Sequence, residues 1–248
     1  MKKIIVLLSL LTLAACGGQG SFNTKQDPQA RHRAELHTNL AAAYFSKGQL
    51  ATALDEFKQA AAIDGTYAPA QIGLGMVYAA LKQDVQAEAG FKRALQLDPG
   101  NSEAHNNYGV FLCSRDRVDE SIHEFLVAVS NPLYTSPASA YTNAGVCALK
   151  KKDSTNAETY FRKALQADLG ARVAAYHMAV ISFDRGEFVQ TRTYLNQSMQ
   201  GVDPNAEMLW LGVRNSRKLN DRDAEASYSL LLKRKYPNSA ETKALMAE

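Results

Sequence analysis

The sequence is poor in the residues that interrupt helices or cross-link small folds. Its 248 residues include 15 glycines, 7 prolines, 3 cysteines and 1 tryptophan, whereas alanine and leucine are abundant. So few helix breakers favour a largely helical chain, and three cysteines are too few for a disulfide-rich scaffold. A formal net charge of +3 is weak for a nucleic-acid-binding protein, which normally has a strong basic bias. The hydrophobic fraction of 46% is typical of a chain with a packed core and excludes global disorder.

Long apolar runs are also missing, except at the N-terminus. Two lysines precede an apolar run over residues 4–13, and the run leads into the sequence Leu-Ala-Ala-Cys, which ends at Cys16. The run is too short for a permanent transmembrane helix and has the layout of a secretory signal. Leu-Ala-Ala-Cys resembles a bacterial lipobox, in which the cysteine thiolate accepts the lipid and the cysteine becomes the first mature residue. The alternative is an ordinary signal peptide cleaved after a small residue.

The resemblance to lipoproteins implies a membrane location as well as a lipid anchor. Residues 1–15 are predicted to be a signal peptide, and residues 16–33 to be the lipidated cysteine and a flexible polar tether. Gly17 follows the cysteine, where an aspartate would usually retain a lipoprotein in the inner membrane. We therefore expect an outer-membrane protein that is lipid-anchored and faces the periplasm. Removing residues 1–15 takes two of the 28 basic residues and leaves 26 against 25 acidic ones, so charge does not select the partner.

From residue 34 onward the chain repeats with a period of 34 residues. The tetratricopeptide pattern is W-x2-L-G-x2-Y, then A-x3-F, then P, and it describes two antiparallel helices. The closest match, in residues 68–101, consists of Leu74, Gly75, Tyr78, Ala87, Phe91, Ala94 and Pro99. The predicted units are 34–67, 68–101, 102–135, 138–171, 172–205 and 207–240, followed by a C-terminal tail at 241–248. The sequence therefore predicts an all-α superhelix of six helix-turn-helix units.

Each unit needs its neighbours, because a single helical pair cannot bury its apolar face. The large side chains at the repeat positions, such as Phe91, Phe125 and Phe161, are therefore predicted to be core residues. Two inserted residues at 136–137 interrupt the period between the third and fourth units. The breaks between the two helices of the units are predicted at Gly48, Gln83-Asp84, Asp116, Lys152-Asp153, Gly186 and Asn220-Asp221.

Catalytic and metal-binding motifs are missing from the sequence. The five histidines are scattered, no cysteine pair has zinc-ligand spacing, and neither a G-x-S-x-G motif nor a P-loop occurs. No nucleophile, base and oxyanion donor stand out as a constellation. We therefore expect a binding protein that is not an enzyme, uses no cofactor or metal, and has no nucleic acid among its partners.

Cys113 and Cys147 occupy the late part of the first helix in neighbouring units. First helices of neighbouring units pack side by side, and a periplasmic protein can keep a disulfide. We favour a Cys113–Cys147 bridge, which would lock the third and fourth units together where the inserted residues interrupt the period. The alternative is a pair of buried free thiols at small-residue positions.

The first helices of tetratricopeptide units line a concave face, towards which positions 2, 5, 9, 12 and 13 of each unit point. In this sequence those positions are mainly apolar and predict a protein-binding groove. The predicted groove residues are Thr38, Phe45, Ile72, Met76, Asn106 and Val110, continued by Thr142, Val146, Tyr176, Val180 and Phe183. The alternative is that the N-terminal segment or the next turn of the superhelix covers part of this face. The lysine and asparagine set that clamps a terminal carboxylate is missing, which argues against a cytosolic chaperone-tail receptor.

Three segments carry residues outside the tetratricopeptide consensus. They are NNYGVFLC at residues 106–113, LWLGVR at 209–214 and DRDAEASY at 221–228. Together with the lipobox and the six units, these segments resemble the PilF/PilW family of type IV pilus pilotins, some members of which have a disulfide at the matching cysteine pair. The resemblance implies an outer-membrane lipoprotein that binds the secretin subunit of the type IV pilus, promotes its localisation and multimerisation, and contributes to fibre stability. Other pilus-assembly proteins are further expected partners.

Two other classes of function are compatible with the same residues. One is a general periplasmic adaptor for the assembly of the envelope or of outer-membrane proteins. The other is an enzyme whose site has no recognisable motif. A deletion strain distinguishes the classes, because a pilotin mutant loses surface pili whereas an adaptor mutant has a general envelope defect.

Overall fold

The computed structural model describes residues 28–247, and every element in that range is an α-helix. The predicted signal peptide and Cys16 lie outside the described residues. The helices form six antiparallel pairs and a final single helix, which confirms the predicted all-α tetratricopeptide superhelix. The pairs are α1 (Pro28–Ser46) and α2 (Leu50–Ile63), α3 (Ala68–Ala80) and α4 (Asp84–Leu97), α5 (Ser102–Ser114) and α6 (Val118–Ser130), α7 (Pro137–Lys150) and α8 (Ser154–Ala167), α9 (Arg172–Asp184) and α10 (Phe188–Met199), α11 (Ala206–Lys218) and α12 (Arg222–Lys235), followed by α13 (Ala240–Ala247).

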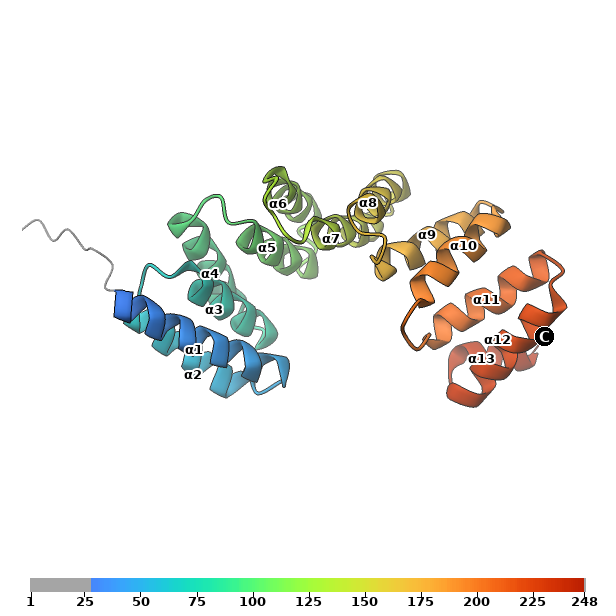
Figure 1. Ribbon diagram of the computed structural model, residues 1–248, viewed down its shortest axis with the longest axis horizontal. Coiled ribbons are helices and arrows are strands. Elements are labelled where there is room, and N and C mark those ends of the chain that lie inside the picture. The colour runs from blue at the N-terminus through green and yellow to red at the C-terminus, as the bar shows by residue number, and fades with distance from the viewer. Residues whose placement is uncertain (1–27, 248) are drawn as a thin grey trace, which may run out of the picture.

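The pairs follow a curved path from α1 and α2 at one end to α11–α13 at the other (Figure 1). Consecutive first helices, such as α5 and α7, approach one another closely. The backbones of consecutive second helices, such as α6 and α8, stay farther apart throughout residues 28–247, and only side chains span the gap, as in the 3.4 Å bond from the Tyr228 hydroxyl on α12 to Asn196 on α10. Because the first helices are closer together than the second helices, the array bends around them. The first helices therefore form its inner, concave face.

In four of the six pairs, a glycine of the first helix faces an aromatic ring of the second helix. Phe91, Phe125 and Phe161 are at most 1% exposed, as expected for core residues. A Cβ atom added to Gly109 would lie 2.7 Å from the ring of Phe125, which is too close for any side chain. The small residues at this repeat position therefore set how closely the two helices of a pair pack.

A residue in the left-handed backbone conformation lies at each turn between the helices of a pair. This conformation reverses the chain and lets an amide beyond it bond the end of the first helix, as in the 2.9 Å bond from Gln83 N to Tyr78 O. Only the second turn differs from the prediction, because its left-handed residue is Lys82 instead of Gln83 or Asp84. The six residues, with φ between 56° and 77°, are Gly48, Lys82, Asp116, Lys152, Gly186 and Asn220.

Helix α1 begins at Pro28, so the predicted tether over residues 16–33 is wrong for residues 28–33. Proline suits the first turn of a helix, because its missing N–H would be unpaired there in any case. Arg31 then fixes the start of α1 to the loop between α2 and α3. Its guanidinium lies 2.7 Å from the carboxylate of Asp64 and 4.8 Å from the ring centroid of Tyr67.

The predicted C-terminal tail is also wrong, because residues 240–247 form helix α13. This helix packs on α11 and α12 and so covers the apolar surface that a seventh unit would otherwise cover. Thr242 is fully buried there, and its hydroxyl donates a 2.7 Å hydrogen bond to the carbonyl of Tyr236. Helix α13 therefore caps the C-terminal end of the array.

Candidate functional site

The inner face of the array is hollowed between neighbouring first helices. Between α5 and α7 lies a hollow of about 240 Å³, lined mainly by Val110, Val146 and Cys113. A second hollow of about 320 Å³ lies between α7 and α9 and shares Asn143 and Val146 with the first. The two hollows form one groove across three first helices, which we call the central groove. Val110 on its edge is 44% exposed, so the groove offers an apolar side chain to a partner.

The structure divides the predicted groove residues into two groups. Thr38, Ile72 and Asn106 are buried between helices, so the prediction that a partner contacts them directly is wrong. The cause is the close approach of consecutive first helices, which covers the positions that face the next first helix. Phe45 and Met76 are half-buried. Of the later positions, Thr142 and Val146 line the central groove, whereas Tyr176, Val180 and Phe183 line a separate hollow nearer the C-terminus.

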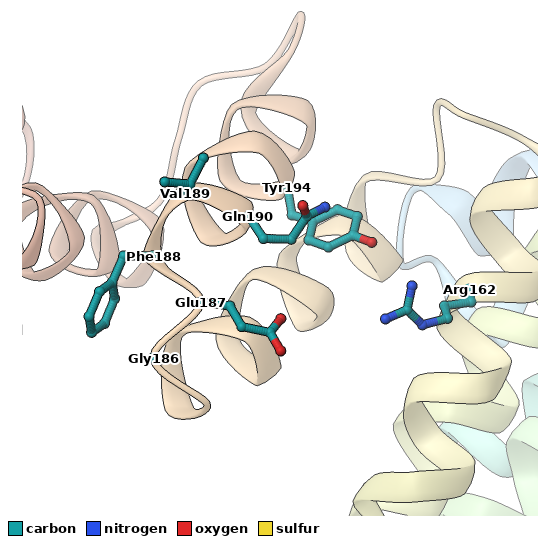
Figure 2. Close-up of a pocket in the computed structure, with 7 residues that line it drawn as sticks. All are labelled: Arg162, Gly186, Glu187, Phe188, Val189, Gln190 and Tyr194. Carbon is teal, nitrogen blue, oxygen red and sulfur yellow. The ribbon is translucent and has the colours of Figure 1, made fainter.

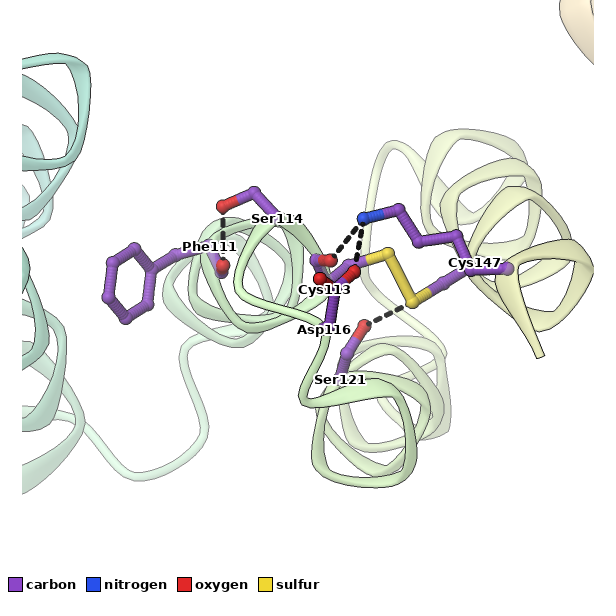
Figure 3. Close-up of a disulfide and its surroundings, with 7 residues drawn as sticks. Phe111, Cys113, Ser114, Asp116, Ser121 and Cys147 are labelled. Atoms are coloured by element: carbon purple, nitrogen blue, oxygen red, sulfur yellow. Dashed lines mark hydrogen bonds and ion pairs between the residues drawn. A yellow bond between two sulfur atoms is a disulfide. The ribbon is translucent and has the colours of Figure 1, made fainter. Parts of the chain in front are cut away.

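A disulfide joins Cys113, a residue of the groove lining, to Cys147 (Figure 3). It joins α5 to α7, with the two Cα atoms 5.9 Å apart. Cys147 is fully buried, and the hydroxyl of Ser121 on α6 donates a 3.3 Å hydrogen bond to its sulfur. The bridge therefore fixes the width of the groove between the third and fourth units.

Polar contacts strengthen the same junction between α5 and α7. The side-chain amide of Asn143 donates a 3.1 Å hydrogen bond to the amide oxygen of Asn106. The ammonium of Lys150 donates a 2.7 Å bond to the carbonyl of Cys113 and lies 3.0 Å from the carboxylate of Asp116. Neither Asn143 nor Lys150 is among the site residues predicted from the sequence. The sequence does contain a signal for Lys150, because Asp116 and Lys150 carry opposite charges at the ends of neighbouring first helices.

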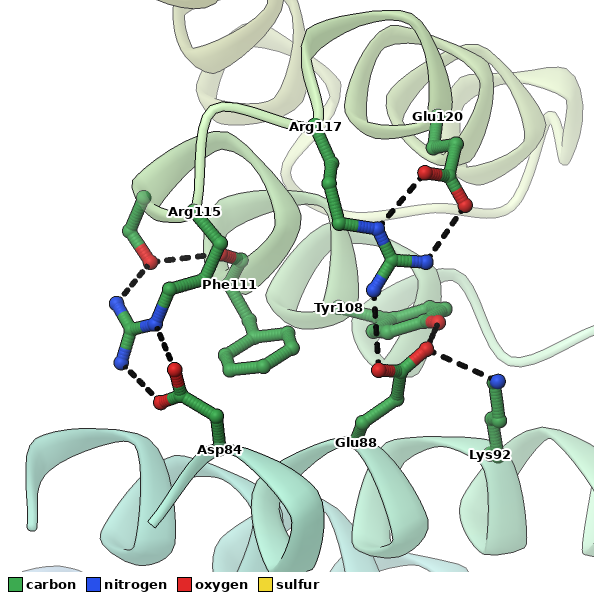
Figure 4. A network of polar contacts seen from close by, with 9 residues as sticks. Asp84, Glu88, Lys92, Tyr108, Phe111, Arg115, Arg117 and Glu120 are labelled. Atoms are coloured by element: carbon green, nitrogen blue, oxygen red, sulfur yellow. Dashed lines mark hydrogen bonds and ion pairs between the residues drawn. The ribbon is translucent and has the colours of Figure 1, made fainter. Parts of the chain in front are cut away.

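A second network ties the third unit to the second, and its centre is Glu88 on α4 (Figure 4). The hydroxyl of Tyr108 donates a 2.8 Å bond to Glu88, and Lys92 and Arg117 lie 2.9 Å and 3.0 Å from the same carboxylate. Burial acts to raise the pKa of Glu88, but the bonds from Lys92, Tyr108 and Arg117 outweigh it and lower the pKa to about 2. Glu88 is therefore held in its charged form.

Aromatic packing supports the same junction. The ring of Phe111 on α5 lies 5.7 Å from that of Phe91 on α4. The guanidinium of Arg115 lies 5.3 Å from the Phe111 ring and also binds Asp84, with the shortest distance 2.6 Å. The segment NNYGVFLC thus supplies contacts to both neighbouring units through Asn106, Tyr108, Phe111 and Cys113. Its residues outside the repeat consensus stiffen the middle of the superhelix.

Another hollow, of about 600 Å³, lies between α8 and the turn that joins α9 to α10 (Figure 2). Glu187, Gln190 and Tyr194 face Arg162 there, whereas Phe188 and Val189 point away from it. Arg162 is already paired with Glu158 of its own helix at 2.7 Å. This hollow lies among second helices, away from the concave face, so we do not regard it as the binding site.

Two features are absent from residues 28–247: a metal-binding cluster and a membrane-spanning helix. Residues 28–247 contain no group of three or more His, Cys, Asp or Glu side chains placed to hold a metal ion. Over the same range, no helix combines the length and the apolarity needed to cross a bilayer. What the geometry supports is a stiff concave surface with an apolar groove at its centre.

Comparisons with known proteins agree with this architecture. The tetratricopeptide-repeat family models match residues 34–67, 91–123 and 138–169. The type IV pilus assembly protein PilF of Pseudomonas aeruginosa is 30% identical over 249 residues, which cover 100% of this chain and 99% of that protein.

Solved structures give the same relatives. A structure of Pseudomonas aeruginosa PilF is similar with a TM-score of 0.82 and 30% identity, over 88% of this chain and 99% of that one. A structure of PilW, described as a widely conserved type IV pilus biogenesis factor, is similar with a TM-score of 0.74 and 27% identity, over 86% and 98% of the two chains. These similarities confirm the resemblance to the PilF/PilW family. The chain belongs to the PilF/PilW family of tetratricopeptide-repeat proteins of type IV pilus biogenesis.

Proposed function

We propose that this protein is an outer-membrane-anchored pilotin whose central groove binds a segment of the secretin subunit of the type IV pilus. By holding that segment, it keeps the subunit from misassembling and promotes multimerisation in the outer membrane. The observation that carries the proposal is the central groove itself, an apolar hollow on a face that the disulfide and the Asn106–Asn143 bond keep rigid. A preorganised apolar groove suits an extended or helical peptide, because little entropy is lost on ordering the receptor.

A charge placed in the groove tests the proposal. In Val110→Asp, a carboxylate replaces the 44% exposed valine on the edge of the groove, so a partner has to desolvate a charge in order to bind. We expect secretin affinity to fall about tenfold or more, and secretin multimers in outer-membrane fractions to fall with it. The matched control is Val85→Asp on α4, an 81% exposed valine outside the lining of the groove.

Both variants should retain the helical circular dichroism of the parent, because both valines already contact water. Equal secretin binding by Val110→Asp and the parent would refute the groove as the binding face. Equal losses in Val110→Asp and Val85→Asp would point to surface charge in general and would refute it as well.

The lipid anchor is a separate part of the proposal and rests on Cys16, outside the described residues. Its support is the lipobox sequence followed by Gly17. A Cys16→Ala protein should leave the outer-membrane fraction and carry no acyl chain by mass spectrometry. Normal outer-membrane fractionation of that variant would refute the anchor, whatever the result for the groove.

The alternative function is that of a general periplasmic adaptor. A deletion strain that keeps its pili but becomes sensitive to detergents would favour the adaptor. A strain that loses pili and secretin multimers with an intact envelope would favour the pilotin.

A further inference from the structure

A third hollow on the concave face lies near the C-terminal end of the array. It has a volume of about 210 Å³ and lies between α9, α11 and α13, the helices at one end of Figure 1. Helix α9 contributes Tyr176 and Phe183, which stand seven residues, two helical turns, apart and so share a face. Helix α11 contributes Trp210. Three aromatic rings thus line a hollow that a bound segment would reach on leaving the central groove.

Three carboxylates surround the same hollow, one from each helix: Asp184, Glu207 and Glu241. None of the three forms an ion pair within residues 28–247, whereas Glu158, Asp203, Asp221 and Glu225 in the same part of the chain do. Arg214 is the one basic residue in the lining, and its guanidinium carbon lies 4.4 Å from the ring centroid of Phe183. The lining therefore has a formal charge of −2.

Two of these carboxylates, those of Glu207 and Glu241, both act electrostatically on the phenol of Tyr176. Burial raises the pKa of Tyr176, and the carboxylates of Glu207 and Glu241 raise it further. Glu207 and Glu241 come from different helices, so α11 and α13 both direct negative charge at the phenol. An aromatic site in a negative field attracts a cation.

We propose that this hollow, the aromatic–acidic pocket formed by Tyr176, Phe183, Asp184, Glu207, Trp210 and Glu241, binds an arginine or lysine side chain of the protein segment held in the central groove. Ring faces attract guanidinium and ammonium groups, most strongly where the cation is partly desolvated. The carboxylates supply the opposite charge. Arginine fits better than lysine, because a planar guanidinium can stack on a ring and bind a carboxylate with two N–H groups at once. The stacking of Arg214 on Phe183 shows the same contact within the protein.

The proposal rests on the concave face being the protein-binding face. It adds a requirement on the sequence of the partner segment, which needs an apolar side chain for the central groove and a basic side chain for the pocket. A metal ion is a poor occupant, because aromatic rings form half of the proposed site and contribute no metal ligand.

The single tryptophan of the chain makes the pocket directly observable. Trp210 fluorescence is recorded while the full chain is titrated with the peptide acetyl-Leu-Ser-Arg-Ser-Leu-amide or with its counterpart carrying citrulline, a neutral analogue of arginine. We expect the arginine peptide to bind about tenfold more tightly, which corresponds to 1.4 kcal/mol. In Asp184→Asn/Glu207→Gln this preference should fall below about threefold. The control Glu35→Gln/Asp55→Asn removes the same charge from α1 and α2 and should keep the full preference.

Equal binding of the two peptides, or an undiminished preference in Asp184→Asn/Glu207→Gln, would overturn the pocket. Secretin binding is measured in parallel to separate the two proposals. A preference for arginine that depends on the two carboxylates, together with no secretin binding, upholds the pocket and refutes the secretin as partner. Secretin binding without a preference for arginine upholds the groove and overturns the pocket.

Discussion

Reduction of the Cys113–Cys147 bridge, with no change of sequence, should destabilise the protein by about 4 kcal/mol. The bridge joins residues 34 apart, and for a loop of that length the chain-entropy relation gives about 3.5–4 kcal/mol at 25 °C. Both sulfur atoms stay in place on reduction, so no cavity adds to this loss. The variant Cys113→Ala/Cys147→Ala should lose roughly 1 kcal/mol more, because Cys147 is 0% exposed and its truncation leaves a void beside Ser121.

Urea unfolding followed by circular dichroism measures this loss. With a slope of about 2–3 kcal/mol per molar urea for a chain of this size, the midpoint of the reduced protein should fall by roughly 1–2 M. The units are coupled only to their neighbours, so the reduced protein should also unfold less cooperatively. The double alanine variant is the control, since a reductant has no disulfide to break there. A shift of less than about 0.3 M on reduction of the parent, or an equal shift in the variant, would refute the reasoning.

Three further changes test the packing, the turns and the electrostatics. Gly109→Ala should lower the free energy of unfolding by about 1–3 kcal/mol, because its Cβ would lie 2.7 Å from the ring of Phe125. The control is Gly100→Ala, whose Cβ would meet no atom closer than 3.8 Å, and equal losses in the two variants would contradict this prediction. Lys152→Gly should stabilise by about 0.5–1 kcal/mol, because glycine relieves the left-handed conformation at φ 60°; a lower urea midpoint than that of the parent would rule this out. His105 should stabilise the protein most at low pH: burial acts to lower its pKa, but the bonds to Glu124 (2.5 Å) and to the Pro99 carbonyl (3.0 Å) outweigh it and raise the pKa above 6.5. That stabilisation is complete below the unfolded pKa of 6.5 and disappears as pH rises through the folded pKa. The loss of unfolding free energy in His105→Gln should therefore be larger near about pH 5.5 than near about pH 8.5, and a loss that does not depend on pH would contradict this prediction.

The repeat architecture could be predicted because it depends on local spacing. A period of 34 residues, with small residues opposite aromatic ones, specifies the helical pairs and their cores. The cysteine pair could be placed on adjacent first helices for the same reason, because both residues fall late in the first helix of their units. In each case the sequence separation determines the contact directly.

The exposure of the inner face could not be read in the same way. Whether Ile72 or Asn106 is open to a partner depends on how closely consecutive first helices approach each other. That distance is set by the packing of many residues along both helices. Helix α13 was also hidden, because eight residues without a repeat pattern resemble a tail. The acids of the aromatic–acidic pocket come from three helices, and no spacing rule brings Asp184, Glu207 and Glu241 together.

A covalent link in the middle of a curved array has a mechanical consequence. A stack of helical pairs joined by side-chain contacts is elastic, and each interface between neighbouring pairs, here called a joint, deforms under part of an applied load. The Cys113–Cys147 bridge removes one of these joints from the series, since a tensile load at that point is carried by bonds. Extension and twisting are then left to the joints on either side, so a pull on a bound segment would widen the two ends of the concave face before it deformed the centre.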